Sequence, residues 1–573
     1  MLKLMRVTPW HLELEVLLVD IKNLTPRFSV SEQITVADMP SLMQAGFKSI
    51  ICNRPDGESS DQTNFKEIEQ AAALQGLSVR YLPVESGKVT DEQGQTFAEL
   101  MDQMPKPILA YCRTGMRSAS LWALANAGTA PLSSIIEITG RAGYDIKALT
   151  RRIIHGGRTP VVTTDVKHDV VIVGGGAAGI SVAASLLARS PQLDIAIIDP
   201  ADVHYYQPGW TMVGAGVFDA SFTARTMGSV LPRGVTWIKS AVAAFEPERN
   251  CVVLQNCQDV TYKQLVVCPG LTLDWDSIEG LTDTLGRNGV TSNYRYDLAP
   301  YTWELVQKLK AGKAIFTQPP MPVKCAGAPQ KAMYLSADYW RKQRVLHHID
   351  IQFCNAGAVL FGVADYVPAL MEYVKAYGIG LNFGRTLISI DGGAKKANFS
   401  QTAADGTKRI ITQNFDMIHV VPPQKAPDFI RVSPLADAAG WVDVDLATLR
   451  HKNYENVFGL GDATNTTNAK TAAAVRKQAP VVAHNLLTAM GRLKGHAKYD
   501  GYGSCPLTVE RGKIVLAEFT YGGKVAPSFP KWLIDGTKPS ILAWYLKERV
   551  LPPLYWDAML KGREWLAQPQ ITN

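Results

Sequence analysis

The 573-residue sequence has no hydrophobic run that approaches the roughly 20 apolar residues needed to cross a bilayer. Its eight cysteines are scattered, with no C-x-x-C pair and no zinc-ligand spacing, so no metal site is expected. Any disulfide is expected to be catalytic, in a reducing cytoplasm. No lysine-rich tail accompanies the net charge of +7, so nucleic acid is not an expected partner. These absences exclude a membrane-spanning protein and a zinc module.

The remaining composition is that of an ordinary folded protein. Hydrophobic residues make up 46% and charged residues 19%, and this length predicts several domains. Residues 1–22 carry too many acids for a signal peptide and are interpreted as a leader. Residues 151–167 are basic and then rich in Gly, Pro and Thr, which is typical of a linker.

A short apolar strand pattern at 170–173 runs directly into a glycine-rich turn and a helical segment. Gly174, Gly176 and Gly179 give the spacing G-x-G-x-x-G, which allows a tight turn, a close approach of pyrophosphate and close packing of helix on strand. Asp199, twenty residues beyond Gly179, ends a second strand and is placed to hydrogen-bond a ribose hydroxyl. A dinucleotide site is therefore predicted, as against a fortuitous glycine turn.

A second stretch, V-F-G-L-G-D-A-T at 457–464, closes the same site. Asp462 in it is placed to meet a ribityl or pyrophosphate group, and the helix expected over 471–487 would point its N-terminus at the ring system. One motif that opens a site and a distant one that closes it indicate FAD rather than NAD.

The middle of the chain has no second glycine fingerprint. The strands expected at 314–316 and 349–353 lead into Pro319-Pro320 and Asn355-Ala356-Gly357, which argues against NAD(P)H as the electron donor. Instead of a second glycine fingerprint, this region contains Cys325, which lies between a lysine and small residues. A helix is expected to begin after it, at about Lys331. Such a cysteine is suited to be a reactive thiolate, although a packed core cysteine is an equal alternative. The other candidate is Cys505, and the sequence does not show that the two meet.

The first 150 residues predict a separate small α/β domain over 23–150. Its third strand, at 107–111, delivers the chain into a loop that begins at Cys112 and contains Arg117. A cysteine between strand and helix has backbone N–H groups directed at its sulfur, and the helix dipole and Arg117 favour the thiolate. The alternative is a buried structural cysteine.

This domain resembles the tyrosine-phosphatase-like family that occurs in bacteria beside or fused to sulfur-handling enzymes. The segment 53–58 and the Cys112 loop carry the resemblance, but the loop lacks the C-x5-R spacing of protein phosphatases because Ser stands at 118. Its pattern C-R-x-G-x-R-S is similar to the rhodanese loop, which carries sulfur as a persulfide. Asp56 and Glu58 are possible general acids, or turn residues. Sulfur transfer is the first hypothesis for this domain and phosphatase activity the second.

The chain over 168–573 resembles the sulfide:quinone oxidoreductases of the mitochondrial branch. The motifs that match include VGGGAAG, HYYQPGWTMVGAG, PVKCAGAPQKAMYLS, VFGLGDATN, KTAAAVRKQ and YDGYGSCPLTVERGKIVLAEF. The resemblance implies that Cys325 and Cys505 form a redox pair, with Lys324 and the helix start near Lys331 stabilising the leaving thiolate. It also implies cofactor-binding roles for Gly174, Gly176, Ala177, Ala178, Gly179, Asp199, Gln207, Gly461, Asp462 and Lys470. Cys268 departs from the family pattern and is given no catalytic role.

By this resemblance the enzyme oxidises sulfide to a persulfide on Cys505 and passes two electrons through FAD to a membrane quinone. The persulfide sulfur would go to a small thiol, to sulfite or to Cys112. The competing functions are an NAD(P)H-dependent disulfide or persulfide reductase and a non-catalytic flavin-binding protein. A homo-oligomer is possible on the sequence.

Residues 527–573 mix aromatic and leucine residues with lysine and arginine, and Pro539 and Pro552-Pro553 interrupt them. This composition predicts short amphipathic helices on a membrane surface, with snorkelling cations, as against helices packed on their own domain. Removal of the segment is expected to leave a soluble, FAD-loaded protein. The expected fold is thus a phosphatase-like α/β domain followed by tandem Rossmann-like units over 168–526 and this segment. The expected location is peripheral, on the cytoplasmic face of a bacterial inner membrane.

Overall fold

The computed structural model describes residues 19–160, 166–403 and 405–572, and the chain divides into two compact units. The first is Met1–Thr164 with Gln255–Gln258, and the second is Asp165–Leu254 with Asp259–Asn573. Both units are built from mostly parallel sheets with helices, which confirms the predicted α/β class.

The first unit contains a five-stranded sheet in the order β1-β2-β5-β3-β4. Only the β1–β2 pair is antiparallel. The strands are β1 (Ile21–Thr25), β2 (Phe28–Ser31), β5 (Ile108–Tyr111), β3 (Ser49–Cys52) and β4 (Ser78–Tyr81). Because β1 begins at Ile21, the predicted leader is wrong by two residues at its end, and residues 1–18 of it lie outside the described residues.

Helices cover both faces of this sheet, since the apolar side chains of its central strands alternate between two cores. Ile108 and Ala110 pack with residues of α3, α4 and α5, and Leu109 and Tyr111 pack with residues of α1 and α2. The helices are α1 (Met39–Gln44), α2 (Phe65–Leu74), α3 (Asp91–Gln103), α4 (Met116–Ala125), α5 (Leu132–Arg141) and α6 (Thr150–Ile154). Helix α6 falls where the linker is predicted to begin, because Ile153 is apolar and buried in this core.

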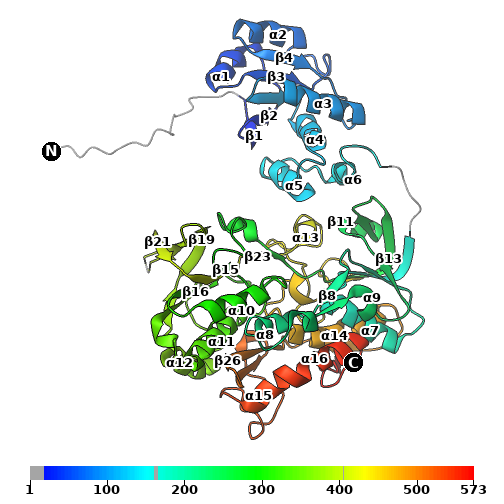
Figure 1. Ribbon diagram of the computed structural model, residues 1–573. Helices are drawn as coiled ribbons and strands as arrows, with labels where there is room; N and C mark the ends of the chain where they lie inside the picture. The colour runs from blue at the N-terminus through cyan, green and yellow to red at the C-terminus, as the bar shows by residue number, and fades with distance from the viewer. Residues whose placement is uncertain (1–18, 161–165, 404, 573) are drawn as a thin grey trace, which may run out of the picture. The chain divides into compact units, whose positions relative to one another are not determined.

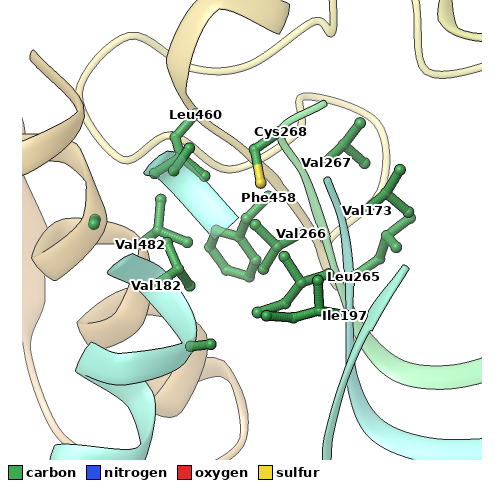
Figure 2. Packing of buried hydrophobic residues seen from close by; sticks show 14 of the residues in the cluster. Val173, Val182, Ile197, Leu265, Val266, Val267, Cys268, Phe458, Leu460 and Val482 are labelled. Atoms are coloured by element: carbon green, nitrogen blue, oxygen red, sulfur yellow. The ribbon is translucent and has the colours of Figure 1, made fainter. Parts of the chain in front are cut away.

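The second unit opens with a sheet in the order β10-β7-β6-β13-β12-β11, to which β24 adds beside β13. Its strands are β6 (Val166–Val173), β7 (Ile195–Ile198), β10 (Val235–Ile238), β11 (Val242–Glu246), β12 (Cys251–Leu254), β13 (Asp259–Val267) and β24 (Val457–Gly459). Helices α7 (Ala177–Arg189) and α14 (Ala472–Ala489) pack against it. Figure 2 shows Phe458 of β24 between Val182 of α7 and the strand residue Val266. The late β24–α14 segment is thus brought beside the early glycine turn.

A second parallel sheet has the order β15-β22-β16-β17-β18, and the antiparallel strands β19, β20 and β21 form a separate sheet that lies between β18 and β22 in the sequence. Figure 1 shows its helices α10 (Ala299–Lys308), α11 (Ala328–Lys342) and α12 (Val367–Ala376) grouped beside β16. The strands are β15 (Val290–Thr291), β16 (Gly312–Gln318), β17 (Ile349–Asn355), β18 (Gly380–Phe383), β19 (Arg385–Asp391), β20 (Lys396–Thr402), β21 (Lys408–Asn414) and β22 (Met417–His419). The chain therefore contains the expected second nucleotide-type sheet.

A hairpin of β26 (Gly503–Glu510) and β27 (Lys513–Phe519) packs on α11, and the C-terminal helical run follows it. That run comprises α15 (Ile541–Tyr545), a π-helical turn at Leu546–Val550, α16 (Leu551–Pro553), a second π-helical turn at Leu554–Ala558 and a 3₁₀ turn at Met559–Lys561. The predicted interruption at Pro552-Pro553 does not occur, since the wide π turns accommodate residues without a backbone donor. Among the described residues, no helix is both long and apolar enough to span a membrane.

Candidate active site

The glycine turn after β6 has the close contacts that its spacing predicts. A Cβ on Gly179 would lie 1.9 Å from the carbonyl oxygen of Gly174, and one on Gly174, whose φ is +106°, would lie 2.6 Å from that of Cys268. A Cβ on Gly176 would meet nothing within 4 Å. Gly174 and Gly179 therefore allow the chain to pack, while Gly176 leaves open space where a ligand can approach the backbone.

A cavity of about 520 Å³ begins at this turn and extends to the cysteine region, and it lies entirely within the second unit. Its volume is typical of a cofactor or ligand site. Eight of the predicted cofactor-binding residues line it: Gly176, Ala177, Ala178, Asp199, Gln207, Gly461, Asp462 and Lys470. Gly174 and Gly179 do not line the cavity, but they allow the close packing of the turn described above.

Acidic and basic groups at the two ends of the cavity hold its loops. Asp199 accepts hydrogen bonds from the backbone N–H of Gly175 at 2.6 Å and of Ala201 at 2.8 Å, so it orders the turn as well as facing the cavity. Burial raises the pKa of Asp462. The Lys470 ammonium donates to the carbonyl oxygens of Asp462 and Thr464 at 2.9 and 2.7 Å, and burial lowers its pKa to about 8.

Three buried polar side chains on the cavity wall have no hydrogen-bond partner among the described residues. They are the indole Nε1 of Trp210, the hydroxyl of Thr211 and the amide of Asn293. An unpaired buried polar group costs free energy unless a ligand or water satisfies it. These groups therefore indicate a polar ligand in this part of the cavity.

The structure brings Cys325 and Cys505 together, although 180 residues separate them in the sequence. Cys505 lies on β26 and donates a hydrogen bond to the sulfur of Cys325. Gly327 allows this approach, because a Cβ there would lie 2.5 Å from the Cys505 Sγ. Cys325 has a φ of +46°, a strained conformation for a residue with a side chain, of the kind that accumulates at functional sites.

The ammonium of Lys331 donates to the Cys325 Sγ at 3.2 Å. The hydrogen bond from Cys505 and the charge of Lys331 lower the pKa of Cys325 well below its usual value. Helix α11 begins at Ala328 rather than at Lys331, because Pro329 suits its first turn. The ammonium of Lys324, which is predicted to stabilise the thiolate, donates instead to the side-chain oxygen of Gln207 at 2.7 Å.

Lys547, from the C-terminal π turn, also lines the cavity and is buried. Burial, and then the charge of Lys331, lower its pKa to about 7. The sequence prediction placed the cations of this segment at a membrane surface, and for Lys547 that prediction is wrong. Nothing in the local sequence marks the difference, because the cysteine pair and Lys331 meet Lys547 only in the tertiary structure.

The rest of the C-terminal segment also lines the cavity and is anchored to α7 and to the short strand β8 (Val203–Tyr205). His204 accepts a hydrogen bond from the Tyr555 hydroxyl at its Nε2, 2.7 Å away, and its Nδ1 lies 3.2 Å from the Gly175 carbonyl oxygen. Glu564 accepts hydrogen bonds from Arg189 and Ser185 at 2.5 to 2.7 Å. The segment is thus part of the site, and its removal would open the cavity rather than leave an intact cofactor-loaded protein.

Cys268, which has no assigned role, packs in the core beside the glycine turn (Figure 2). Burial raises its pKa far above the ordinary value, so it is held as a neutral thiol. The other described cysteines outside the two sites have no metal-binding arrangement, and no group of His, Cys, Asp or Glu among the described residues is placed to hold a metal ion.

In the first unit, Cys112 lies between β5 and α4, at the predicted place in the chain, and its side chain is buried. Gly115, with a φ of +83°, passes beneath Tyr144, whose hydroxyl would lie 2.1 Å from a Cβ at that position. Arg117 is buried, and its two terminal nitrogens donate to the two carboxylate oxygens of Glu58 at 2.6 and 2.9 Å. Arg117, which is predicted to favour the Cys112 thiolate, is therefore also paired with Glu58, which the sequence suggests as a general acid.

Comparison with known proteins assigns both units. Residues 20–129 match the phosphatase-like domain of beta-lactamase hydrolase-like protein, and residues 168–302 match pyridine nucleotide-disulphide oxidoreductase. The mitochondrial sulfide:quinone oxidoreductase of Dictyostelium discoideum is 44% identical over 407 residues, which are 70% of this chain and 88% of that protein. The chain belongs to the sulfide:quinone oxidoreductase family.

Two further similarities concern the fold of the oxidoreductase unit and the N-terminal domain. The solved sulfide:quinone oxidoreductase of Aquifex aeolicus superposes with a TM-score of 0.59 at 18% identity, covering 69% of this chain and 92% of that one, which shows a common fold. The beta-lactamase hydrolase-like protein of Agrobacterium fabrum is 33% identical over 131 residues, which are 22% of this chain and 30% of that protein. The chain is thus an oxidoreductase of this family that also carries a phosphatase-like N-terminal domain.

Proposed function

We propose that this enzyme oxidises sulfide to a persulfide on Cys505, uses FAD, and passes two electrons to a membrane quinone. The observation that carries the proposal is the Lys331 ammonium on the Cys325 sulfur, at the wall of the cavity, with the free thiol of Cys505 hydrogen-bonded to the same sulfur. A lysine–thiolate pair next to a second cysteine is the arrangement that thiol–disulfide chemistry requires. The names of the relatives support the same substrates.

The residues of the cavity fit FAD. The open face of Gly176 and the first turn of α7 suit a pyrophosphate, and the carboxylates of Asp199 and Asp462 lie at the two predicted ends. The unpaired polar groups of Trp210 and Asn293 suit the polar edge of a ring system. When bound, FAD supplies a two-electron acceptor that a thiolate can reduce and a quinone can reoxidise.

Cys325 and Cys505 are free thiols in the structure, and the proposed step starts from their oxidised form, in which the two sulfurs are joined in a disulfide. The protein's own step is the cleavage of this disulfide. Hydrosulfide attacks the sulfur of Cys505, a new S–S bond forms there, and the bond to Cys325 breaks, so that the electron pair stays on the Cys325 sulfur. Cys505 then carries the persulfide and Cys325 is a thiolate. Lys331 stabilises this thiolate through its charge-assisted hydrogen bond, which makes Cys325 the better leaving group.

An NAD(P)H-dependent reductase is the main alternative. The chain after β16 reaches Cys325 and α11 at the position expected for a dinucleotide fingerprint. Strand β17 ends at Asn355 and continues into Ala356 and Gly357, again without that motif. Anaerobic addition of sulfide is expected to bleach the flavin absorbance, whereas NADH is expected to leave it unchanged. Bleaching by NADH alone would overturn the proposal. Mass spectrometry should then find an added sulfur on Cys505, which Cys505→Ser abolishes.

For the first unit we propose sulfane-sulfur transfer through Cys112 rather than phosphatase activity. Both candidate general acids have other partners: Asp56 accepts a hydrogen bond from the backbone N–H of Phe65 at 2.8 Å, and Glu58 pairs with Arg117 and Arg54. Arg117 lowers the pKa of Glu58, so this carboxylate does not hold a proton for a leaving group. A phosphatase would lack its acid here.

The test uses the full chain and its Cys112→Ser variant with thiosulfate, a persulfide donor and an aryl phosphate. Sulfur transfer is expected to require Cys112, and phosphate release is not expected. Cys112-dependent phosphate release without sulfur transfer would favour the phosphatase. A small thiol or sulfite is the proposed final acceptor, and unchanged turnover and products of Cys112→Ser with every acceptor would exclude Cys112 as an acceptor.

We also propose peripheral association with a membrane, where a quinone is available. The C-terminal segment exposes several large apolar side chains: Trp532, Leu533, Ile541, Leu542, Tyr545, Trp565 and Leu566. Exposed aromatic and aliphatic groups near lysines and arginines are typical of interfacial segments.

A further inference from the structure

Arg117, next to Cys112, does not offer a free positive charge to a substrate. Three of its five N–H groups are taken, two by the carboxylate of Glu58 and one by the carbonyl oxygen of Val84 at 2.7 Å. The side chain of Arg117 is 8% exposed and that of Glu58 24%, so water screens this pair only in part. The remaining N–H groups are left for the Cys112 side.

Glu58 serves a second buried arginine as well. The Nε of Arg54 donates to the Glu58 Oε2 at 3.0 Å, and its terminal nitrogens donate to Gln33 and Ser59, each at 2.9 Å. Hydrogen bonding from Arg117 lowers the pKa of Glu58, which therefore stays ionised at neutral pH. Arg54, Glu58 and Arg117 together carry a formal charge of +1, whereas the two arginines alone would carry +2.

Arg117 connects this carboxylate to the reactive sulfur. The hydrogen bonds that Arg117 donates to Glu58, and then the charge of Cys112, raise the pKa of Arg117, so the guanidinium interacts with both groups. Arg117 lies in the first turn of α4, five residues after Cys112, so Glu58 pairs with the cation of the Cys112 loop itself. A dianion that approaches Cys112 meets a cation already neutralised by its neighbour.

We propose that Glu58 is the specificity-determining residue of the Cys112 site, which selects hydropersulfides of small thiols and discriminates against dianionic donors such as thiosulfate and phosphate esters. The inference rests on the proposed sulfur transfer and names its substrate class. In the favoured step the Cys112 thiolate attacks the outer sulfur of RS–SH, a Cys112–S–SH bond forms, and RS⁻ leaves with the electrons of the broken bond. With thiosulfate the same attack would release the sulfite dianion beside Glu58.

The test is Glu58→Gln, which keeps an acceptor for Arg117 and removes the charge. Full-length protein is treated with thiosulfate or with cysteamine persulfide, which carries no net negative charge, and the rate of sulfur addition at Cys112 is measured by peptide mass spectrometry. The rate with thiosulfate is expected to rise about tenfold, and the rate with the persulfide to change less than about threefold. Glu85→Gln removes an exposed carboxylate of the same unit, paired with Lys88, and should change neither rate.

A second readout separates this inference from the sulfur-transfer proposal. Thiosulfate should protect Cys112 from iodoacetamide at an about tenfold lower concentration in Glu58→Gln than in the wild type. If Cys112 accepts sulfur from neither donor but protection still improves, sulfur transfer is wrong and the role of Glu58 in anion selection stands. If neither the thiosulfate rate nor protection changes, the role assigned to Glu58 is wrong.

Folding of the variant can be checked within the same samples. Cys52 is buried, and burial raises its pKa to about 11, so it should remain unlabelled as long as the unit is folded. If Glu58→Gln exposes Cys52, Gln33→Glu tests the same idea with the opposite sign, because it adds a carboxylate to Arg54. That variant should lower the thiosulfate rate severalfold, and an unchanged or higher rate would contradict the proposal.

Discussion

At the scale of single residues, Lys331 contacts the more acidic cysteine of the redox pair. Its ammonium is 3.2 Å from the Cys325 sulfur, and the hydrogen bond from Cys505 together with the charge of Lys331 lowers the pKa of Cys325, whereas the hydrogen bond to Cys325 and burial raise the pKa of Cys505. The pair is therefore asymmetric: Cys325 is suited to leave as a thiolate and Cys505 to keep the added sulfur.

We expect Lys331→Met to slow alkylation of Cys325 at pH 7 by about tenfold or more, because a hydrogen bond to a charged group contributes about 1.5–3 kcal/mol. The pH at which Cys325 becomes reactive should move upwards, since the low pKa of this thiol depends on the ammonium. Iodoacetamide labelling followed by peptide mass spectrometry measures both. Lys324→Met, which loses a contact with Gln207 instead, should leave Cys325 reactivity nearly unchanged. Equal effects of the two substitutions would contradict this role of Lys331.

The glycines of the turn after β6 give a second prediction at this scale. Gly179→Ala puts a methyl group 1.9 Å from a backbone oxygen, so we expect a lower thermal unfolding midpoint and little bound flavin. Gly176→Ala meets open space, so the fold should remain while flavin is lost, because the methyl group occupies the approach of the pyrophosphate. Flavin absorbance per chain and thermal unfolding distinguish the two cases, and a fully flavin-loaded Gly176→Ala protein would exclude this phosphate site.

At the scale of elements, the C-terminal run is the wall that completes the site. Its first π turn supplies Lys547, and Tyr555 donates a hydrogen bond to His204 on β8 (Val203–Tyr205). Burial lowers the pKa of His204 to about 4, so the ring is neutral in the folded protein at physiological pH. This contact makes the docking of the run sensitive to acid.

Because the folded pKa of His204 lies below its ordinary value of 6.5, the docked form loses stability as the pH falls from about 6.5 towards 4. We expect hydrogen-exchange protection of residues 546–561 to fall more between pH 7 and pH 5 in the wild type than in His204→Asn, which has no such titration. Protection factors corrected for intrinsic exchange measure this. The same pH dependence in both proteins would show that His204 is not the titrating group.

At the scale of the whole molecule, one chain combines a phosphatase-like domain with an oxidoreductase of the sulfide:quinone family. Each unit has its own sheet and its own core, and each site lies entirely within one unit. The exposed apolar side chains of the C-terminal segment are the surface through which we expect the molecule to reach a membrane.

The combined substitution of Trp532, Ile541 and Leu542 by serine should weaken binding to anionic lipid vesicles at least about tenfold, since each buried apolar side chain contributes about 1.5–3 kcal/mol. These residues are 84%, 67% and 51% exposed, so the cavity wall should stay intact and flavin content unchanged. Vesicle sedimentation measures binding. Ile410→Ser is the matched control, because Ile410 is 70% exposed on β21. Undiminished vesicle binding of the triple variant would place the contact elsewhere.

The sequence alone was sufficient for the features that depend on neighbours along the chain. The strand–turn–helix at Gly174–Gly179, the strand before Asp462 and the cysteine loop at Cys112 all occur where they are predicted, because glycine spacing and apolar runs determine them locally. The boundaries differ by a few residues, as at α11, where Pro329 starts the helix earlier than expected.

Only the tertiary structure decided which charged groups meet which sulfurs. Lys331 rather than Lys324 contacts Cys325, Lys547 turns inward, and Glu58 pairs with Arg117 across 59 residues of sequence. None of these contacts leaves a trace in local spacing, because a buried ion pair forms wherever folding brings opposite charges together away from water. The sequence determined where the reactive cysteines stand, and the packing of distant segments determined their charge environment.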